Sequence, residues 1–358
     1  MVHLLLGFPV LLSLVGYKNK AVRIFSFIWL FLFAALRYSF GNDYSGYHRW
    51  YTYIKNGGAS PYDGEPLFTL LNAVSPSYFL LVAFTSAVFV FVVYRLAERE
   101  LNDFSFALAV FVFCINPYIF LMNLSAIRQS LATAVFIIAV EYAIKRKPIH
   151  YAALIIIASL FHKSALILFP IYFIVAPKKI KPKTVKIIIL LVLTAILFLD
   201  IKRISGIVAV PLGGGEYLHH ISEGIGNSLR ATVLTSIYFV YLIFNFNKTD
   251  GKMAAYSKIY FVAVICGVLA YRVSAFTRIQ MYFDVFSVVT LPYLFVKNTE
   301  QKIIACGDVP TKSVIFGVIN KYVLPCLIVI IYLLRYYSFF TNPDWSSFHS
   351  YRSLFELL

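Results

Sequence analysis

Long apolar runs recur along the whole chain and are separated by short polar or basic stretches. An α-helix needs roughly 20 apolar residues to cross a hydrocarbon core of about 30 Å, so these runs predict membrane spans. Two of the runs are short and meet at His162 and Lys163, which indicates either two spans or one bent, re-entrant element. The predicted number of spans is therefore ten to twelve, near residues 1–17, 21–36, 76–95, 104–121, 127–144, 149–161, 164–177, 185–200, 229–247, 257–276, 279–297 and 321–340.

The composition agrees with this pattern. The 358 residues are 60% hydrophobic and only 13% charged, and the mean hydropathy is +0.79, whereas soluble domains are about 45–50% apolar and about 25% charged. No segment is polar enough to form a separate soluble domain. We therefore expect an all-α polytopic membrane protein with one membrane domain over 1–358, two outer loops at 37–75 and 201–228, and an outer tail at 341–358.

Basic residues indicate the orientation. If the spans alternate, one side of the membrane carries 16 Lys and 4 Arg and the other carries 3 Lys and 9 Arg. The more positive side is expected to be cytoplasmic, which places both termini outside. The net charge of +16 is thus scattered over short loops, and nucleic-acid binding is not expected. The cytoplasmic loops would be 18–23, 95–99, 145–147, 178–186, 248–258 and 297–321.

The change from Lys to Arg between the two sides carries more information than the totals. Orientation requires positive charge of either kind. Arg additionally offers a planar set of donors that matches phosphate oxygens bidentately. An outer face rich in Arg therefore suggests an anionic, phosphate-bearing ligand. The alternative is that these side chains reach lipid headgroups.

The stretch Arg37–Tyr53, RYSFGNDYSGYHRWYTY, is unusually polar and aromatic for a loop between membrane helices. Gly41 and Asn42 permit a tight turn, which would bring Asp43 back toward Arg37 at the membrane face. Such a carboxylate stays ionised and can orient the Arg or accept a proton, or it can simply satisfy backbone donors at a turn. The tyrosines form either an interfacial belt or a surface that stacks on sugars.

Further candidates lie at the same predicted face. Arg128 opens a span slightly inside the apolar zone, where an unpartnered Arg costs roughly 2.5–3.5 kcal/mol, so a partner or a wet cavity is expected. His162 lies at the break between the two short spans and is either a helix-packing residue or a functional one. Arg272 and Arg278 flank a tight turn and can clamp one anion from two helices. The four Cys match no metal spacing, so neither a disulfide nor a metal site is expected.

These residues resemble a known family. RYSFGNDYSGYHRW resembles the Arg-x-x-x-Gly-x-Asp-Tyr-x-x-Tyr signature of the EpsG family, which comprises Wzy-type polysaccharide polymerases. The similarity continues in the same order at Glu65-Pro66-Leu67-Phe68, Ala126-Ile127-Arg128-Gln129-Ser130-Leu131-Ala132, Phe161-His162-Lys163-Ser164-Ala165, Arg278-Ile279-Gln280-Met281-Tyr282-Phe283 and Asn342-Pro343.

The resemblance implies a bacterial inner-membrane enzyme, similar to GT-C-like multi-span glycosyltransferases, that polymerises O-antigen, capsule or exopolysaccharide repeats. The substrates would be undecaprenyl-pyrophosphate-linked oligosaccharides. A flippase and a chain-length regulator would be its partners. No metal or other cofactor is expected, because Arg residues would stabilise the charge on the departing pyrophosphate.

The residues and the resemblance together give a set of expected roles. Catalysis is assigned to Arg37, Asp43, Arg128 and His162, with Asp43 or His162 as the base. Pyrophosphate binding is assigned to Arg128, Arg230, Arg272, Arg278 and Lys163. Sugar binding is assigned to Tyr44, Tyr47, Gln129 and Tyr282. The outer loop 201–228 matches no motif.

Two other functions are weighed against polymerisation. A lipid-linked oligosaccharide flippase would carry cationic residues at mid-span and show two similar halves, and neither is visible here. A membrane acyltransferase acting on surface polysaccharide would favour His and Arg on the cytoplasmic side, where this chain has mainly Lys.

Overall fold

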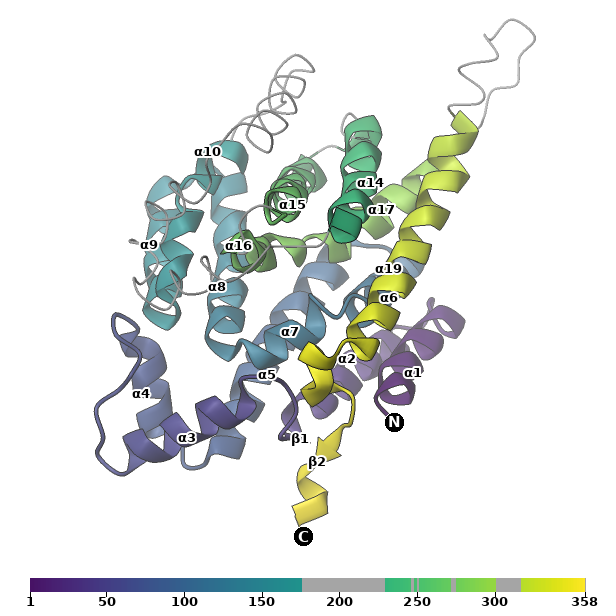
Figure 1. Ribbon diagram of the computed structural model, residues 1–358. Helices are drawn as coiled ribbons and strands as arrows, with labels where there is room; N and C mark the ends of the chain where they lie inside the picture. The colour runs from purple at the N-terminus through teal and green to yellow at the C-terminus, as the bar shows by residue number, and fades with distance from the viewer. Residues whose placement is uncertain (176–228, 246–247, 250, 272–274, 301–316, 358) are drawn as a thin grey trace, which may run out of the picture. The chain divides into compact units, whose positions relative to one another are not determined.

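The computed structural model describes residues 1–175, 229–245, 248–249, 251–271, 275–300 and 317–357 (Figure 1). The predicted span at 185–200, the loop 201–228 and Arg272 lie outside this part. The described residues are mainly helical, with one two-stranded sheet. They belong to two compact units: the first contains Met1–Ala143, Lys147–Phe169 and Tyr332–Leu358, and the second contains Ile144–Arg146 and Pro170–Ile331.

The first unit begins with apolar helices that pack against one another. Helix α1 contacts α2 and α6, and α2 also contacts α5. Polar side chains stabilise the helix starts: Asn19, Ser77 and Asn102 each accept a hydrogen bond from an early backbone N–H of α2, α5 and α6. The helices of this unit are α1 (Val2–Val15), α2 (Lys20–Ala35), α3 (Tyr44–Lys55), α4 (Pro66–Val74), α5 (Tyr78–Glu100), α6 (Asp103–Ile115), α7 (Phe120–Ser125), α8 (Ile127–Ile144) and α9 (Pro148–Phe161), followed by the 3₁₀ helix η1 (Lys163–Leu168).

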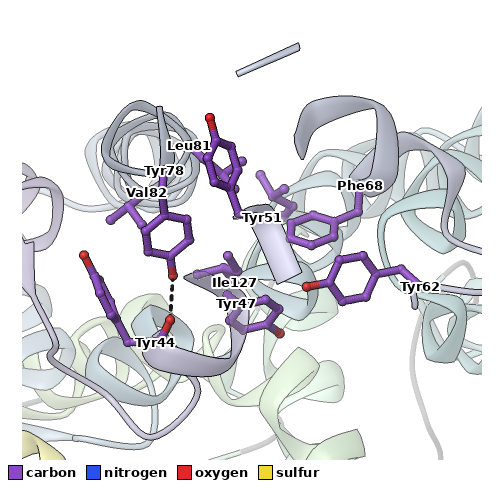
Figure 2. Packing of buried hydrophobic residues seen from close by; sticks show 10 residues of the cluster. Tyr44, Tyr47, Tyr51, Tyr62, Phe68, Tyr78, Leu81, Val82 and Ile127 are labelled. Carbon is purple, nitrogen blue, oxygen red and sulfur yellow. Dashed lines mark hydrogen bonds between the residues drawn. The ribbon is translucent and has the colours of Figure 1, made fainter. Parts of the chain in front are cut away.

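The segment 37–75 was expected to be a loop, but it contains the helices α3 and α4. Helix α3 forms because Tyr44, Tyr47 and Tyr51 recur at helical spacing and are all buried. They pack with Tyr62, Phe68 and Tyr78 in the cluster of Figure 2. Two hydrogen bonds connect this cluster to backbone oxygens, Tyr78 Oη to Tyr44 O (3.0 Å) and Tyr51 Oη to Ser75 O (2.8 Å). The segment is thus folded, and its aromatic core is shared with α5 and α8.

Residues near the C-terminus pair with and contact the first residues of this segment. Strand β1 (Arg37–Tyr38) pairs antiparallel with β2 (Arg352–Ser353), and Arg37 lies opposite Ser353. Figure 1 labels the two strands next to each other. Gly41 has φ +105°, which an L side chain rarely adopts, and an added Cβ would lie 3.5 Å from the Phe348 ring. Asn42 Nδ2 donates to Asp344 O (3.1 Å). The tail elements are the 3₁₀ helices η4 (Pro343–Phe348) and η5 (Leu354–Leu357) on either side of β2.

The predicted break at His162 is confirmed. Helix α9 ends at Phe161, His162 has an extended backbone (φ −155°, ψ 110°), and η1 begins at Lys163. The break leaves the first backbone N–H groups of η1 without helical partners, so they can bond a side chain.

The second unit is organised around α15 (Gly251–Leu269), which packs against α14 (Leu229–Asn245), α16 (Ala275–Asp284) and α17 (Ser287–Glu300). Three buried amides join the ends of its helices. Asn245 Oδ1 accepts from Asn298 Nδ2 (3.0 Å) and Asn320 Nδ2 (2.9 Å). The remaining elements are α10 (Ile171–Val175), the π-helical turn η3 (Ile319–Val323) and α19 (Leu324–Thr341), whose second half belongs to the first unit.

Within the described residues, four helices are long and apolar enough to cross a membrane, and a bent pair can form a fifth span. The pair is α16 and α17, which meet at 57°. The structure is thus consistent with an all-α membrane protein, while the count of ten to twelve spans and the GT-C-like architecture stay predictions. The four long helices are Tyr78–Glu100, Ile127–Ile144, Gly251–Leu269 and Ile319–Thr341.

Candidate functional site

A buried carboxylate joins two of the four predicted catalytic residues, Arg128 and His162. Glu65 is 1% exposed. Its Oε2 accepts a hydrogen bond from Arg128 Nη1 (2.7 Å), and its Oε1 contacts His162 Nδ1 (2.8 Å). The backbone N–H of Lys163 donates to the same Oε1 (3.2 Å). Two separate segments of the first unit, the start of α8 and the break after α9, therefore converge on the carboxylate of Glu65.

Local structure explains why these groups meet. Glu65 is the residue before α4, and Gly64 before it has φ +73°, a conformation that glycine adopts at little cost. Arg128 is the second residue of α8, directly after the short helix α7 ends. His162 and Lys163 occupy the break after α9, and α9 packs against α4. The break thus presents an imidazole and an unused backbone donor to Glu65.

The electrostatics keep Glu65 ionised. Burial raises its pKa, but the hydrogen bond from His162 and the positive charge of Arg128 outweigh burial, and the pKa lies below its ordinary value. An ionised carboxylate only accepts hydrogen bonds. The contact with His162 is therefore Nδ1–H donating to Oε1, which makes Nε2 the ring nitrogen that carries the lone pair in the neutral imidazole.

Two tyrosines support the guanidinium of Arg128. Its Nε donates to Tyr47 Oη (3.2 Å), and its Cζ lies 4.8 Å from the Tyr62 ring centre and 5.7 Å from that of Tyr47. Figure 2 shows Tyr47 and Tyr62 in the aromatic cluster, beside Phe68. The Tyr62 hydroxyl is buried and has no hydrogen-bond partner among the described residues. Tyr62 therefore acts on Arg128 through its ring.

Arg128 retains donors for a ligand. A guanidinium has five N–H donors. One on Nε and one on Nη1 are used by Tyr47 and Glu65, which leaves three without a partner in the described structure. The side chain is 29% exposed. Arg128 is thus held in one orientation while part of its hydrogen-bonding edge stays available.

Arg37 is placed differently. It is 1% exposed. Its Nη1 donates to Ala34 O and to Ser86 Oγ (2.8 Å), and its Nη2 donates to Leu124 O (2.9 Å). The guanidinium therefore ties the end of α2 to α5 and α7. These bonds favour a structural role over the predicted contact with pyrophosphate.

The predicted pairing of Asp43 with Arg37 does not form. Asp43 stands just before α3; its carbonyl accepts from Tyr47 N (2.9 Å) and its N–H donates to Ser125 Oγ (3.0 Å). The expected turn at Gly41 is present, since Gly41 O accepts from Tyr44 N (3.2 Å). Asp43 is partly exposed and does not belong to the Glu65 network.

The predicted sugar-binding residues are all buried. Tyr44 is 7% exposed, Tyr47 is 9%, Gln129 is 2% and Tyr282 is 1%. Tyr44 and Tyr47 are part of the aromatic cluster, so their rings pack against protein in this structure. Tyr282 belongs to the second unit.

The other predicted cations are only partly described. Arg278 is an exposed residue of α16 in the second unit. Arg230 is the second residue of α14, but its side chain, like Arg272, lies outside the described part. The side chain of Lys163 is partly exposed and lies near Gly64, 3.9 Å from the position a Cβ would take there. Among the described residues no group of three or more His, Cys, Asp or Glu is placed to hold a metal ion.

Two members of the site, Glu65 and Tyr62, were not predicted from the sequence. Glu65 was noted only as part of the motif Glu65-Pro66-Leu67-Phe68, and Tyr62 was not noted. One local signal for Glu65 was available. It is an acidic residue directly before a proline that can open a helix, and it lies in an aromatic outer segment. Its partners are 63 and 97 positions away, and no local pattern connects them.

The sequence model of the EpsG family matches residues 20–353, nearly the whole chain. The chain therefore belongs to the EpsG family, and this family is one of Wzy-like polymerases. Family membership identifies the chain as a membrane protein of the class of glycosyltransferases that polymerise polysaccharide. Neither the curated proteins nor the solved structures contain a match to the chain.

Proposed function

We propose that the protein joins undecaprenyl-pyrophosphate-linked oligosaccharide repeats on the extracytoplasmic face of a bacterial inner membrane. The donor is the growing chain on lipid pyrophosphate, and the acceptor is one lipid-linked repeat. Family membership supports the reaction class, and the Arg128–Glu65–His162 network supplies groups with the required chemistry.

The proposal rests on the fixed orientation of Arg128 and on its unused N–H donors. Arg128 is fixed by Glu65 and Tyr47 and keeps three N–H donors for a ligand at a partly exposed position. A planar set of charged donors matches phosphate oxygens. Because these donors are already oriented, they stabilise the charge that develops on the leaving pyrophosphate without reorganisation.

His162 is the better supported base of the two predicted candidates. Its Nδ1 is bonded to Glu65, so its Nε2 is the ring nitrogen able to take a proton. In the reaction, an acceptor hydroxyl oxygen forms a bond to the anomeric carbon and the bond from that carbon to the pyrophosphate oxygen breaks. The electron pair leaves on the pyrophosphate, and the hydroxyl proton moves to Nε2. Asp43 lies apart from this network, and Arg37 supports it by holding α2, α5 and α7 together.

A gel of surface polysaccharide from a strain lacking the protein separates this function from the alternatives. Loss of a polymerase leaves a core that carries one repeat. Loss of a flippase leaves no repeat, and loss of an acyltransferase leaves the full ladder. We expect the single-repeat band.

Complementation of this strain tests the site. Wild type and Arg99→Ala should restore the ladder, whereas Arg128→Ala should not. Arg99→Ala is a matched control because it also removes a cation from an ion pair. That pair, Arg99 with Glu141 (2.5 Å), lies outside the network. A full ladder with Arg128→Ala at normal protein abundance would refute the proposed role of Arg128.

A further inference from the structure

We propose that Glu65 is a positioning residue that fixes the tautomer of His162, with the proton on Nδ1 and the reactive lone pair on Nε2. This inference rests on the proposed function, because it assigns the atom that removes the acceptor's proton. Glu65 does not touch the substrate in this account. It acts through His162 on one side and Arg128 on the other.

The geometry supports a single orientation of the carboxylate. Oε1 lies 2.8 Å from His162 Nδ1 and 3.2 Å from Lys163 N, while Oε2 lies 2.7 Å from Arg128 Nη1. Rotation of the carboxylate would break contacts at both oxygens. At 1% exposure, water cannot easily replace them. The plane of Glu65 is therefore set by the backbone of one neighbour and the side chains of two others.

The same contacts determine which ring nitrogen holds the proton. The Lys163 N–H and the Arg128 Nη1–H both donate to the carboxylate. The positive charge of Arg128 favours the ionised form of Glu65, which has no proton to donate. His162 must then donate through Nδ1. Partners of this kind fix both the tautomer and the ring plane of a histidine and raise its basicity. The low pKa of Glu65 agrees with this assignment.

The proposed step balances with these groups alone. The acceptor's O–H proton moves to Nε2 as the new glycosidic bond forms, and the resulting imidazolium is stabilised by the negative charge of Glu65. The bond to pyrophosphate breaks, and its electron pair stays on the pyrophosphate oxygen. The imidazolium later returns its proton to water, which restores the resting site.

The pH dependence follows from the charged groups around the imidazole. Among the contacts that the structure describes, these groups include Glu65 before α4, Arg128 at the start of α8 and Lys163 at the start of η1, with Tyr47 of α3 bonded to the guanidinium. Glu65 is the only anion in this set and favours the protonated imidazole. Its neutralisation therefore shifts the acidic limb of the kcat profile to lower pH.

A spectroscopic measurement tests the tautomer without relying on activity. The full chain is labelled with ¹⁵N-histidine, reconstituted in lipid nanodiscs at a pH where the histidine is neutral, and compared with His162→Gln to assign the signal. We expect a protonated Nδ1 and an unprotonated Nε2. An Nε2–H tautomer at His162 would overturn the inference.

Kinetics test whether the tautomer matters for the reaction. Glu65→Gln keeps the shape but removes the charge, so kcat should fall about 10- to 100-fold with little change in KM, and the acidic limb should move to lower pH. Glu65→Asp should retain the limb near its wild-type position. Glu141→Gln, which neutralises a carboxylate paired with Arg99 instead, should leave both quantities unchanged.

The outcomes separate this inference from the proposed function. If His162→Gln polymerises at the wild-type rate, the base step of the proposed function is wrong. If His162→Gln is inactive but Glu65→Gln keeps both kcat and the pH limb, the positioning role of Glu65 is wrong and the base step stands. If the Glu65→Gln protein does not fold, the nanodisc spectrum of the wild type decides the question, because it reports the tautomer of His162 without the variant.

Discussion

Arg128→Ala should slow chain growth by about 100-fold. The guanidinium keeps three N–H donors after bonding Tyr47 and Glu65, and a bidentate anion would use two of them. Charge-assisted hydrogen bonds contribute about 1.5–3 kcal/mol each. We discount their sum to about 3 kcal/mol because the side chain is 29% exposed and water screens the interaction. At about 1.4 kcal/mol per tenfold change in rate, this corresponds to roughly a hundredfold.

The same change should have a smaller effect on stability. Breaking a buried pair by removing one partner costs about 3–5 kcal/mol. Here Glu65 keeps the donors of His162 and Lys163, so we expect about 1–2 kcal/mol. Arg128→Lys retains the charge but presents one point donor group, so the rate should fall about tenfold.

The assay measures the rate of chain extension by purified protein in liposomes, with thermal unfolding measured on the same samples. Arg99→Ala serves as the control for removal of an ion-paired Arg. A rate within threefold of wild type for correctly folded Arg128→Ala would refute the reasoning, because it would show that the N–H donors of Arg128 do not stabilise the leaving pyrophosphate.

Three further predictions concern neighbouring residues. Arg37→Leu removes three hydrogen bonds at a buried position, so it should lower stability by about 3 kcal/mol, seen as a lower Tm, with kcat of the folded fraction nearly unchanged. Tyr62→Phe removes a buried hydroxyl that has no partner in the described structure but keeps the ring under Arg128, so the Tm should stay equal or rise, and a clear fall would contradict this. The pKa of Glu65 lies below its ordinary 4.5, so its contribution to stability is full above about pH 4.5 and is lost as the pH falls through the lower folded-state value. The difference in Tm between wild type and Glu65→Gln should therefore stay constant above about pH 4.5 and shrink as the pH falls below it, and a difference that stays constant in acid would refute the assignment.

The sequence predicts well what depends on local apolar patterning. The helices α8, α9 and α15 and the break at His162 follow from the length of apolar runs and from polar residues that interrupt them. The break was predictable because the two apolar runs that meet at His162 and Lys163 are each short for a membrane span. Backbone groups left unpaired at such a break need a polar partner. The identity of that partner, Glu65, depends on contacts far apart in the sequence.

The segment 37–75 shows why a local pattern was misread. Its polar composition suggested a loop, although Tyr44, Tyr47 and Tyr51 already had helical spacing. The pairing of Arg37 with Asp43 was inferred from their proximity in sequence. In the structure, the guanidinium is instead used by backbone and hydroxyl acceptors of α2, α5 and α7, which only the tertiary arrangement brings within reach.

The central claim is that this protein alone joins lipid-linked repeats. It is tested most directly with purified protein in liposomes, supplied with an undecaprenyl-pyrophosphate-linked single repeat and with no other protein. We predict chains of two or more repeats and release of one lipid pyrophosphate for each bond formed, with both signals reduced about 100-fold by Arg128→Ala. Transfer of the lipid-linked repeat across the bilayer without any new glycosidic bond would contradict the account.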